Sequence, residues 1–170
     1  MGRCGYRYVV ALGSNRRHHR HGPPRAVLAA ALAALDCAGL QLLRASRTVD
    51  SRPLGPSLRT YANAIALVAS ELEPEAMLIR LKAIEADFGR RRGGQRWTAR
   101  VLDLDLVLWN GGTWASPGLI IPHPAYRLRD FVLAPMRHWG PLARDPLSGL
   151  TPAHLHARLT RPRALPKSRP

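Results

Sequence analysis

Apolar residues recur along the first 110 positions with two different periods, which alternate along the chain. Residues 6–12 are aromatic and β-branched and stop at a Gly-Ser-Asn turn, which predicts a strand. From Pro24 the apolar residues fall on one helical stripe, and Gly39 is placed to end that helix. Residues 40–50 then predict a second strand, and residues 51–60 predict a connecting loop.

The same succession repeats in the next fifty residues. Residues 61–72 predict a third strand, and Pro74 opens a second amphipathic helix that stops near Gly89. An arginine-rich loop at 90–100 leads into a fourth strand at 101–108. The order β-α-β-β-α-β predicts an α+β, ferredoxin-like sandwich: an antiparallel sheet with helices on one face, extra C-terminal elements, and the other face free to bind a ligand.

The pattern weakens after about residue 113, where short apolar pieces are broken by prolines. Residues 151–170 contain five basic residues, no acidic residue and several prolines. We therefore expect one domain at residues 1–150 and a basic, proline-containing tail at 151–170 that is mobile.

Two aspartates interrupt the fourth strand. Asp103 and Asp105 point to the same face, while the leucines at 102, 104, 106 and 108 point to the other face and require a core. Carboxylates at this spacing lie about 6.5 to 7 Å apart at the backbone, so both can reach one or two hard cations such as magnesium. Alternatively, they are solvated surface residues or partners of nearby arginines.

The charge of the chain indicates an anionic ligand. Twenty-six Lys and Arg stand against 11 Asp and Glu, a formal charge of +15, which suits nucleic acid, a membrane surface or a phosphorylated small molecule. Arginine forks next to paired carboxylates favour a polyphosphate, although the loop could also be merely solvated. Neither a P-loop nor a Rossmann glycine motif is present, so side chains would have to bind the phosphates. These arginines are Arg90, Arg91, Arg92, Arg96 and Arg100.

Cysteine and histidine usage limits the compartment and the chemistry. Cys4 and Cys37 offer neither a CxxC pair nor a disulfide framework, which fits a reducing compartment, and we expect the cytoplasm. No stretch approaches the roughly 18 apolar residues of a membrane span. His18, His19 and His21 lack a neighbouring cysteine or acidic ligand, so a flexible cationic loop is favoured over a metal site.

Several short motifs then occur in a fixed order. They are ALGSN, RPLGP followed by YANA, IEADFGR, RW with R-x-LDLDL, and IPHP leading to R-D-FVLAP. In this order they resemble the 6-hydroxymethyl-7,8-dihydropterin pyrophosphokinases, enzymes of folate biosynthesis, over roughly residues 8–141. One departure is Thr98-Ala99, which stands where the family commonly has Gly-Pro.

The resemblance implies that residues 1–150 form a pyrophosphokinase domain. It would transfer pyrophosphate from ATP, the co-substrate, to the hydroxymethyl oxygen of the pterin and release AMP. The implied catalytic residues are Arg90, Arg100, Asp103 and Asp105, and the two aspartates would bind two magnesium ions. ATP would contact Glu85, Arg92, Arg96, Trp97, His123 and Arg129. The pterin would contact Ser51, Arg52, Leu54, Tyr61, Asn63 and Phe131.

Two alternatives stay open. A pterin-pathway paralogue could keep this architecture and accept a different pterin. A nucleic-acid-binding module could share the β-α-β-β-α-β order and the positive charge, but it should expose aromatic residues on the central strands, where this chain has Val9, Ala11 and aspartates. We expect a monomer that binds small molecules and neither nucleic acid nor a membrane.

Overall fold

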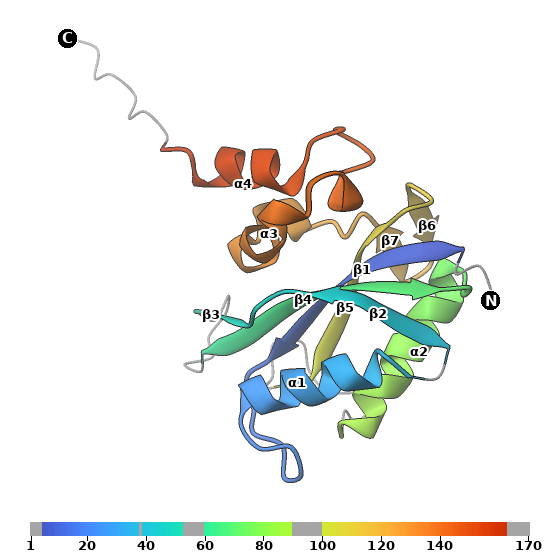
Figure 1. Ribbon diagram of the computed structural model, residues 1–170, viewed down its shortest axis with the longest axis vertical. Coiled ribbons are helices and arrows are strands. Elements are labelled where there is room, and N and C mark those ends of the chain that lie inside the picture. Colours follow the sequence, from blue (N-terminus) through green and yellow to red (C-terminus); the bar gives the residue numbers. More distant parts are fainter. Residues whose placement is uncertain (1–4, 38, 53–59, 90–99, 163–170) are drawn as a thin grey trace.

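The computed structural model describes residues 5–37, 39–52, 60–89 and 100–162 (Figure 1). In these residues the predicted succession of strands and helices is present, with additional short elements after residue 113. No helix in the described part of the chain has both the length and the apolar character needed to cross a bilayer.

The central sheet is antiparallel throughout, with the strand order β2–β4–β1–β5 and β3 paired to β4. This arrangement confirms the predicted sheet and places β1 in its middle, between β4 and β5. The strands are β1 (Tyr6–Ser14), β2 (Leu40–Ala45), β3 (Val49–Ser51), β4 (Tyr61–Ser70) and β5 (Asp103–Trp109).

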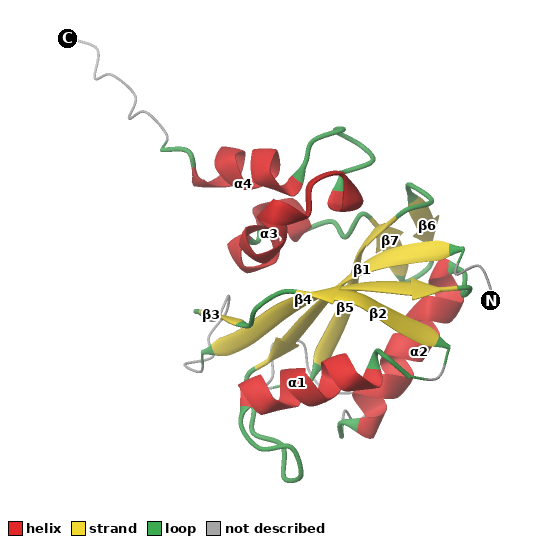
Figure 2. Ribbon diagram, in the orientation of Figure 1, coloured by secondary structure: helices red, strands yellow, loops and turns green. Residues whose placement is uncertain are grey.

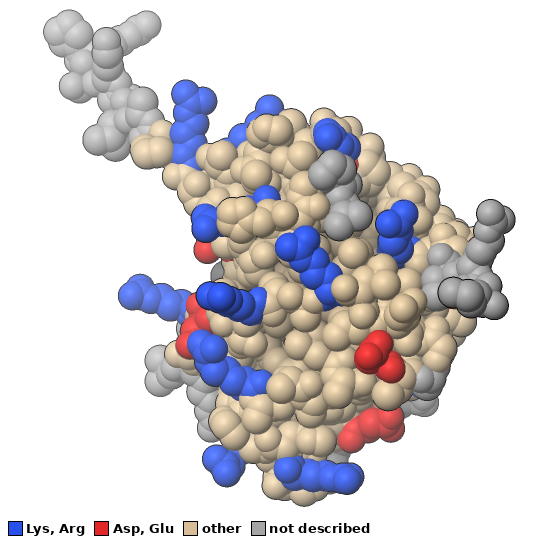
Figure 3. Space-filling view, viewed as in Figure 1, with Lys and Arg blue, Asp and Glu red and all other residues tan. Residues whose placement is uncertain are grey.

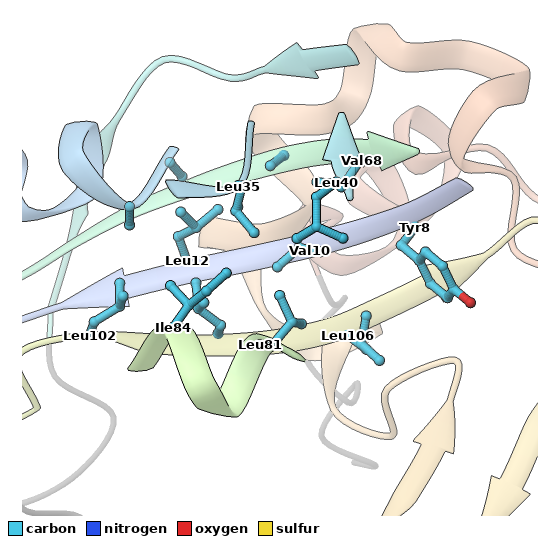
Figure 4. Close-up of a cluster of buried hydrophobic side chains, with 14 of the residues drawn as sticks. Tyr8, Val10, Leu12, Leu35, Leu40, Val68, Leu81, Ile84, Leu102 and Leu106 are labelled. Carbon is cyan, nitrogen blue, oxygen red and sulfur yellow. The ribbon is translucent and has the colours of Figure 1, made fainter. Parts of the chain in front are cut away.

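Two helices cover one face of the sheet, α1 (Pro24–Ala34) and α2 (Pro74–Asp87) (Figure 2). Each begins with proline, whose fixed φ suits the first helical turn and whose missing N–H is not needed there. The main core lies between these helices and the sheet (Figure 4). Its larger members include Tyr8, Val10, Leu12, Leu28, Leu35, Met77, Leu81, Leu104 and Leu106.

The second face of the sheet is not free, as the sequence predicts, but partly covered. The C-terminal elements η1 (Tyr126–Leu128), α3 (Asp130–Met136), η2 (Arg137–Ala143) and α4 (Pro152–Thr160) lie on the side opposite α1 and α2 (Figure 1). They close a second core against β1, β4 and β5. Buried here are Val9, Ile65, Leu67, Val107, Leu108, Val132, Leu133, Met136 and Leu155.

Part of the predicted tail is a helix. Thr151 caps α4 by accepting a hydrogen bond from the His154 N–H, and Pro152 occupies the first turn. Leu155 is buried in the second core, and Leu159 packs against it. The stripe is only two leucines long, too short to stand out from the basic, proline-rich composition. Residues 163–170 lie outside the described part of the chain.

Two local irregularities also differ from the predicted strands. Residues 40–50 form two strands rather than one, because Ser46 interrupts the ladder and its Oγ accepts the Ile65 N–H at 2.9 Å. A register shift between β1 and β5 at Val9 and Val10 places Leu108 opposite Val9. Leu108 therefore belongs to the second core, not to the leucine face predicted for it.

A hairpin of β6 (Trp114–Ser116) and β7 (Leu119–Ile121) follows β5. The chain then returns along the outer edge of β5, where the His123 N–H donates to the Val107 carbonyl at 3.0 Å. This bond brings residues 123–131 alongside the strand that carries the two aspartates.

Candidate functional site

α3 and α4 leave part of the second sheet face open, and small side chains line the middle of that part. Gly13 of β1 lies opposite Asn63 of β4 on one side and Asp103 of β5 on the other. One step along the strand, Ala11 lies opposite Asp105. A Cβ on Gly13 would lie 3.8 Å from Asn63 Oδ1, so these small residues leave space between the amide on one strand and the carboxylates on another.

Asp103 is held by an arginine. The Nη1 of Arg100 lies 2.7 Å from both carboxylate oxygens of Asp103. Burial opposes the charge of Arg100, but Asp103, and to a smaller degree Asp105 and Glu85, outweigh burial and raise the pKa of the guanidinium. The side chains of Arg100 and Asp103 remain 32% and 25% exposed, so ligand atoms can reach this pair.

Asp105 faces a guanidinium and an imidazole from the segment that follows β7. Arg129 Nη1 lies 3.4 Å from Asp105 Oδ2, and His123 Nε2 lies 3.9 Å from the same oxygen. The three side chains come from β5, from the chain beside its outer edge and from the residue before α3. The structure therefore brings together Arg100, Asp103, Asp105, His123 and Arg129, all of which the sequence places in the site.

The contacts of His123 determine where its proton lies when the ring is neutral. Its Nδ1 accepts a hydrogen bond from the Ala125 N–H at 3.1 Å, so Nε2 carries the proton and faces Asp105. Burial lowers the pKa of the imidazole below its ordinary value, while Asp105 opposes this effect and Arg129 adds to it. His123 can thus present an N–H donor to the space beside Asp105.

Asn15 joins the end of β1 to the start of β5. Its N–H donates to the Arg100 carbonyl at 3.1 Å, and its Oδ1 accepts the Arg100 N–H at 2.8 Å. Its buried Nδ2 has no hydrogen-bond partner among the described residues, so a donor remains next to Arg100. The sequence places Asn15 only within a turn motif, because its contact with Arg100 spans 85 positions.

Glu85 lies behind the aspartate strand rather than in the open site. Its side chain on α2 is fully buried and accepts a hydrogen bond of 2.7 Å from the Leu104 N–H. The Nζ of Lys82 lies 3.0 and 3.1 Å from its two oxygens. The bond to Leu104 connects α2 to β5. The contact of Glu85 with ATP stays a prediction.

A cavity of about 480 Å³ opens between β3 and the start of α3. Its lining includes three residues that the sequence places at the pterin, namely Ser51, Arg52 and Phe131. Arg129 also lines it and lies with its guanidinium carbon 6.0 Å from the Phe131 ring centre. The remaining lining residues are Val49, Asp50, Leu128, Asp130 and Ala134.

Leu128 lines this cavity, and the sequence does not predict its place there. It is 76% exposed and stands at the cavity although it is a large apolar side chain. A lone leucine between two arginines gives no periodic signal, so only the fold reveals its place.

Asn63 lies next to this cavity on β4. It is 5% exposed, and its Nδ2 donates to Ser51 Oγ at 2.9 Å and to the Tyr61 carbonyl at 3.4 Å. Because Tyr61 pairs with Ser51 across the two strands, the three predicted pterin residues are neighbours. Other predicted site residues lie outside the described part of the chain: Leu54, Arg90, Arg92, Arg96 and Trp97.

The two carboxylates fit a hard divalent cation. Asp103 and Asp105 share one strand face and remain a quarter to a third exposed. No group of three or more metal-ligating side chains is found among the described residues. Magnesium suits such a sparse donor set, because it commonly takes one or two carboxylates and keeps its remaining positions for water and substrate phosphate.

The histidines of residues 16–22 lie in a turn. His18 is 6% exposed, and its Nδ1 accepts hydrogen bonds from the N–H groups of Arg20 and His21, each at 3.1 Å. Burial, followed by the charges of its neighbours, lowers the pKa of His18. The His21 ring stacks on Phe88 at 4.8 Å. The flexible loop expected here is therefore a folded turn docked on the end of α2.

The family model and the known proteins similar to this chain agree on one family. The model of the 7,8-dihydro-6-hydroxymethylpterin-pyrophosphokinase family (HPPK) matches residues 9–141. The 2-amino-4-hydroxy-6-hydroxymethyldihydropteridine pyrophosphokinase of Synechocystis sp. is 38% identical over 144 residues, which cover 84% of this chain and 71% of that protein. The enzyme of the same name from Pseudomonas aeruginosa is 37% identical over 142 residues, which cover 82% of this chain and 84% of that protein.

Solved structures show the same fold. A crystal structure described as HPPK-DHPS in complex with substrates superposes with a TM-score of 0.66 over 90% of this chain, at 12% identity. The HPPK-DHPS of Plasmodium falciparum gives the same TM-score at 13% identity. The chain spans less than half of either structure, 43% and 44% of their lengths.

Proposed function

Since this chain belongs to the 7,8-dihydro-6-hydroxymethylpterin-pyrophosphokinase family, we propose that Asp103, Asp105 and the cationic groups around them are its catalytic centre. The family assigns the reaction: the enzyme transfers pyrophosphate from ATP to 6-hydroxymethyl-7,8-dihydropterin in folate biosynthesis. The observation that carries the assignment is the meeting of two carboxylates, two guanidinium groups and an imidazole beside a cavity.

Asp103 and Asp105 are the ligands that we assign to two magnesium ions. When bound, magnesium neutralises phosphate charge and stabilises the charge that develops in phosphoryl transfer. The carboxylates project from one strand, so their separation is set by the backbone of β5. Arg100 orients Asp103 through its two contacts of 2.7 Å.

Arg129 and His123 are the donors that we assign to the nucleotide side. Arg129 lies near Asp105 and also lines the cavity, so its guanidinium can contact both a phosphate and the second substrate. The His123 Nε2–H can donate to an anionic oxygen without requiring a charged ring. Such fixed donors stabilise charge at low reorganisation cost. To the same side we assign Glu85, Arg90, Arg92, Arg96 and Trp97, with Arg90 and Arg100 acting on the transferred phosphates.

The cavity between β3 and α3 is the place that we assign to the pterin. Phe131 offers an aromatic face for stacking, and Asn63 offers an amide that can read donors and acceptors on a ring edge. The hydroxymethyl oxygen would then point from the cavity toward the space between Arg129 and Asp105. The further pterin residues in this proposal are Ser51, Arg52, Leu54 and Tyr61.

The remaining assignments concern the whole protein. We propose that residues 1–150 form the pyrophosphokinase domain, that the protein acts as a monomer, and that it acts in the cytoplasm. Binding to nucleic acid is not favoured, because α3 and α4 cover the middle of the second sheet face. In addition, Lys and Arg side chains are spread over the face shown in Figure 3.

Product analysis tests the proposed reaction. The protein is incubated with ATP, magnesium and 6-hydroxymethyl-7,8-dihydropterin, and nucleotides are separated by chromatography. AMP should form in equal amount to the pterin diphosphate and only when the pterin is present. Formation of ADP would show simple phosphoryl transfer and contradict the proposal. Formation of AMP with another pterin only would show the altered specificity of a paralogue.

A further inference from the structure

Glu85 forms an unusual contact for a helix residue. Its fully buried carboxylate accepts a hydrogen bond of 2.7 Å from the backbone N–H of Leu104, a residue of a strand. The same carboxylate forms a salt bridge of 3.0 Å with Lys82, whose side chain is 43% exposed. A buried charge loses its hydration, so it requires such partners.

Leu104 lies between the two aspartates. Its side chain points into the main core and is fully buried, whereas the side chains of Asp103 and Asp105 point to the opposite face. Any shift or twist of the backbone at Leu104 therefore moves both carboxylates.

The position of β5 in the sheet explains why this N–H needs a partner. Among the described strands, β5 lies at the edge of the sheet and pairs with β1. Glu85 provides at Leu104 the acceptor that a further strand would otherwise supply. Three residues further along, the Val107 carbonyl accepts the His123 N–H. The outer edge is thus held at two points, one on each side of Asp105.

Packing fixes Glu85 in this place. Its neighbour Ile84, and Leu81 one turn earlier, pack in the main core with Leu102, just before β5, and with Leu106 of β5 (Figure 4). A helix seated in this way presents the Glu85 side chain to the strand edge with little freedom of rotation.

We propose that Glu85 is a positioning residue for the two aspartates. Through the Leu104 N–H it fixes the β5 backbone, so that the carboxylates keep the separation that metal binding needs. This inference rests on the proposed function of Asp103 and Asp105. It gives Glu85, which we assign above to the nucleotide side, an action through the strand that needs no direct contact with ATP.

The experiment varies the hydrogen-bond acceptor, the charge and the volume of the side chain at position 85. Glu85→Gln keeps an oxygen for Leu104 and removes the charge, whereas Glu85→Met removes the acceptor and nearly keeps the volume. Lys82→Met removes the lysine of the salt bridge to the carboxylate. Glu75→Gln is the matched control, because Glu75 lies exposed in the first turn of the same helix.

Two readouts separate positioning from a merely structural role. The first is the affinity for manganese, used as a paramagnetic substitute for magnesium, with a non-hydrolysable ATP analogue present. The second is the hydrogen-exchange rate of the Leu104 amide. Glu85→Met should weaken manganese binding about tenfold or more, as for residues that orient metal ligands, and should speed exchange at Leu104. The manganese affinity should stay within about threefold of the wild-type value in Glu85→Gln, Lys82→Met and Glu75→Gln.

Three results would overturn the inference. Wild-type manganese affinity in Glu85→Met would show that the aspartates do not depend on this bond. An equal loss in Glu85→Gln would show that the charge matters and not the bond. An equal loss in Glu75→Gln would show a general effect of helix α2. If Glu85→Met does not fold, Glu85→Leu provides the same comparison. The manganese and exchange readouts need no turnover, so failure of the AMP assay would count only against the reaction.

Discussion

Asn15 and Arg100 hold each other through a reciprocal pair of hydrogen bonds, in which the Asn15 N–H donates to the Arg100 carbonyl and Asn15 Oδ1 accepts the Arg100 N–H. Arg100 in turn contacts both oxygens of Asp103. The turn after β1 thereby determines the position of Arg100, three residues before the strand that carries the two aspartates.

Asn15→Ala should lower turnover about tenfold and destabilise the protein by about 1–2 kcal/mol, because the partly buried Arg100 N–H loses its acceptor. Urea unfolding and steady-state kinetics measure the two effects. Asn110→Ala is the control, since Asn110 Oδ1 accepts the Arg7 N–H at 2.7 Å at the opposite end of β1. A control that loses as much turnover as Asn15→Ala would contradict a specific role of the turn.

Asp103→Asn and Asp105→Asn should each reduce kcat by about 10² to 10³, the loss expected when a preorganised electrostatic contact is removed. Both substitutions keep the side-chain size at a partly exposed position, so the melting temperature should change little. Steady-state kinetics and calorimetric melting test these expectations. Asp87→Asn, at the exposed end of α2, should keep full activity. Near-normal turnover in both site variants would refute their assignment as metal ligands.

Asn63→Ala should weaken pterin binding about tenfold or more, because the substitution removes a buried amide that we assign to hydrogen bonds with the pterin ring edge. ATP binding should stay intact, because the amide is assigned to the pterin alone. Isothermal titration calorimetry with each ligand separates the two affinities. Ser51→Ala should have a smaller effect of the same kind, since it removes only the 2.9 Å partner of the Asn63 amide. Equal losses for ATP and pterin in Asn63→Ala would argue against the assignment.

Asp145 should make the fold sensitive to acid. Burial opposes its ionisation, but hydrogen bonds from Arg127 and Ser148 outweigh burial and hold its pKa well below the ordinary range. Because the folded pKa is lowered, the stabilising contribution is complete above the unfolded value near pH 4 and declines as the pH falls further.

Asp145→Asn should therefore cost about 2 kcal/mol at pH 7, and the difference from the wild type should shrink below pH 4. This estimate is reduced from the usual cost of breaking a buried pair, because Arg127 is 30% exposed. Urea unfolding across pH 3 to 7 measures it. Asp50→Asn breaks the exposed pair with Arg25 and should cost at most about 0.5 kcal/mol. A difference that does not depend on pH would contradict the role of ionised Asp145.

The sequence predicts the sheet and its first two helices well, because each element is long and periodic. It also places Asp103 and Asp105 on one face, since side chains alternate along any strand. It does not predict that α3 and α4 close the second face. The apolar stripes of these helices are short, and their partners on β1 and β4 are more than sixty residues away.

For the site, motif resemblance selects residues that the fold then brings together, such as His123 and Arg129 beside Asp105. The roles of Asn15, Leu128 and the Leu104 backbone are not visible in the sequence. Each depends on a contact or a cavity between elements that are far apart in the chain. An N–H at a strand edge, in particular, belongs to every residue and leaves no mark in the sequence.

Substitutions on the two faces of β5 should have different effects. In a scan of all single substitutions, these effects should alternate from one residue to the next along the strand. At Leu104 and Leu106, most replacements should lower the amount of folded protein in the cell, because both side chains lie in the main core. At Asp103 and Asp105, replacements should leave abundance high while growth that depends on folate synthesis fails. This alternation should end at Val107, because the register shift turns Leu108 to the face of the aspartates. Replacements at Val107 and at Leu108 should both lower the amount of folded protein, since both side chains lie in the second core.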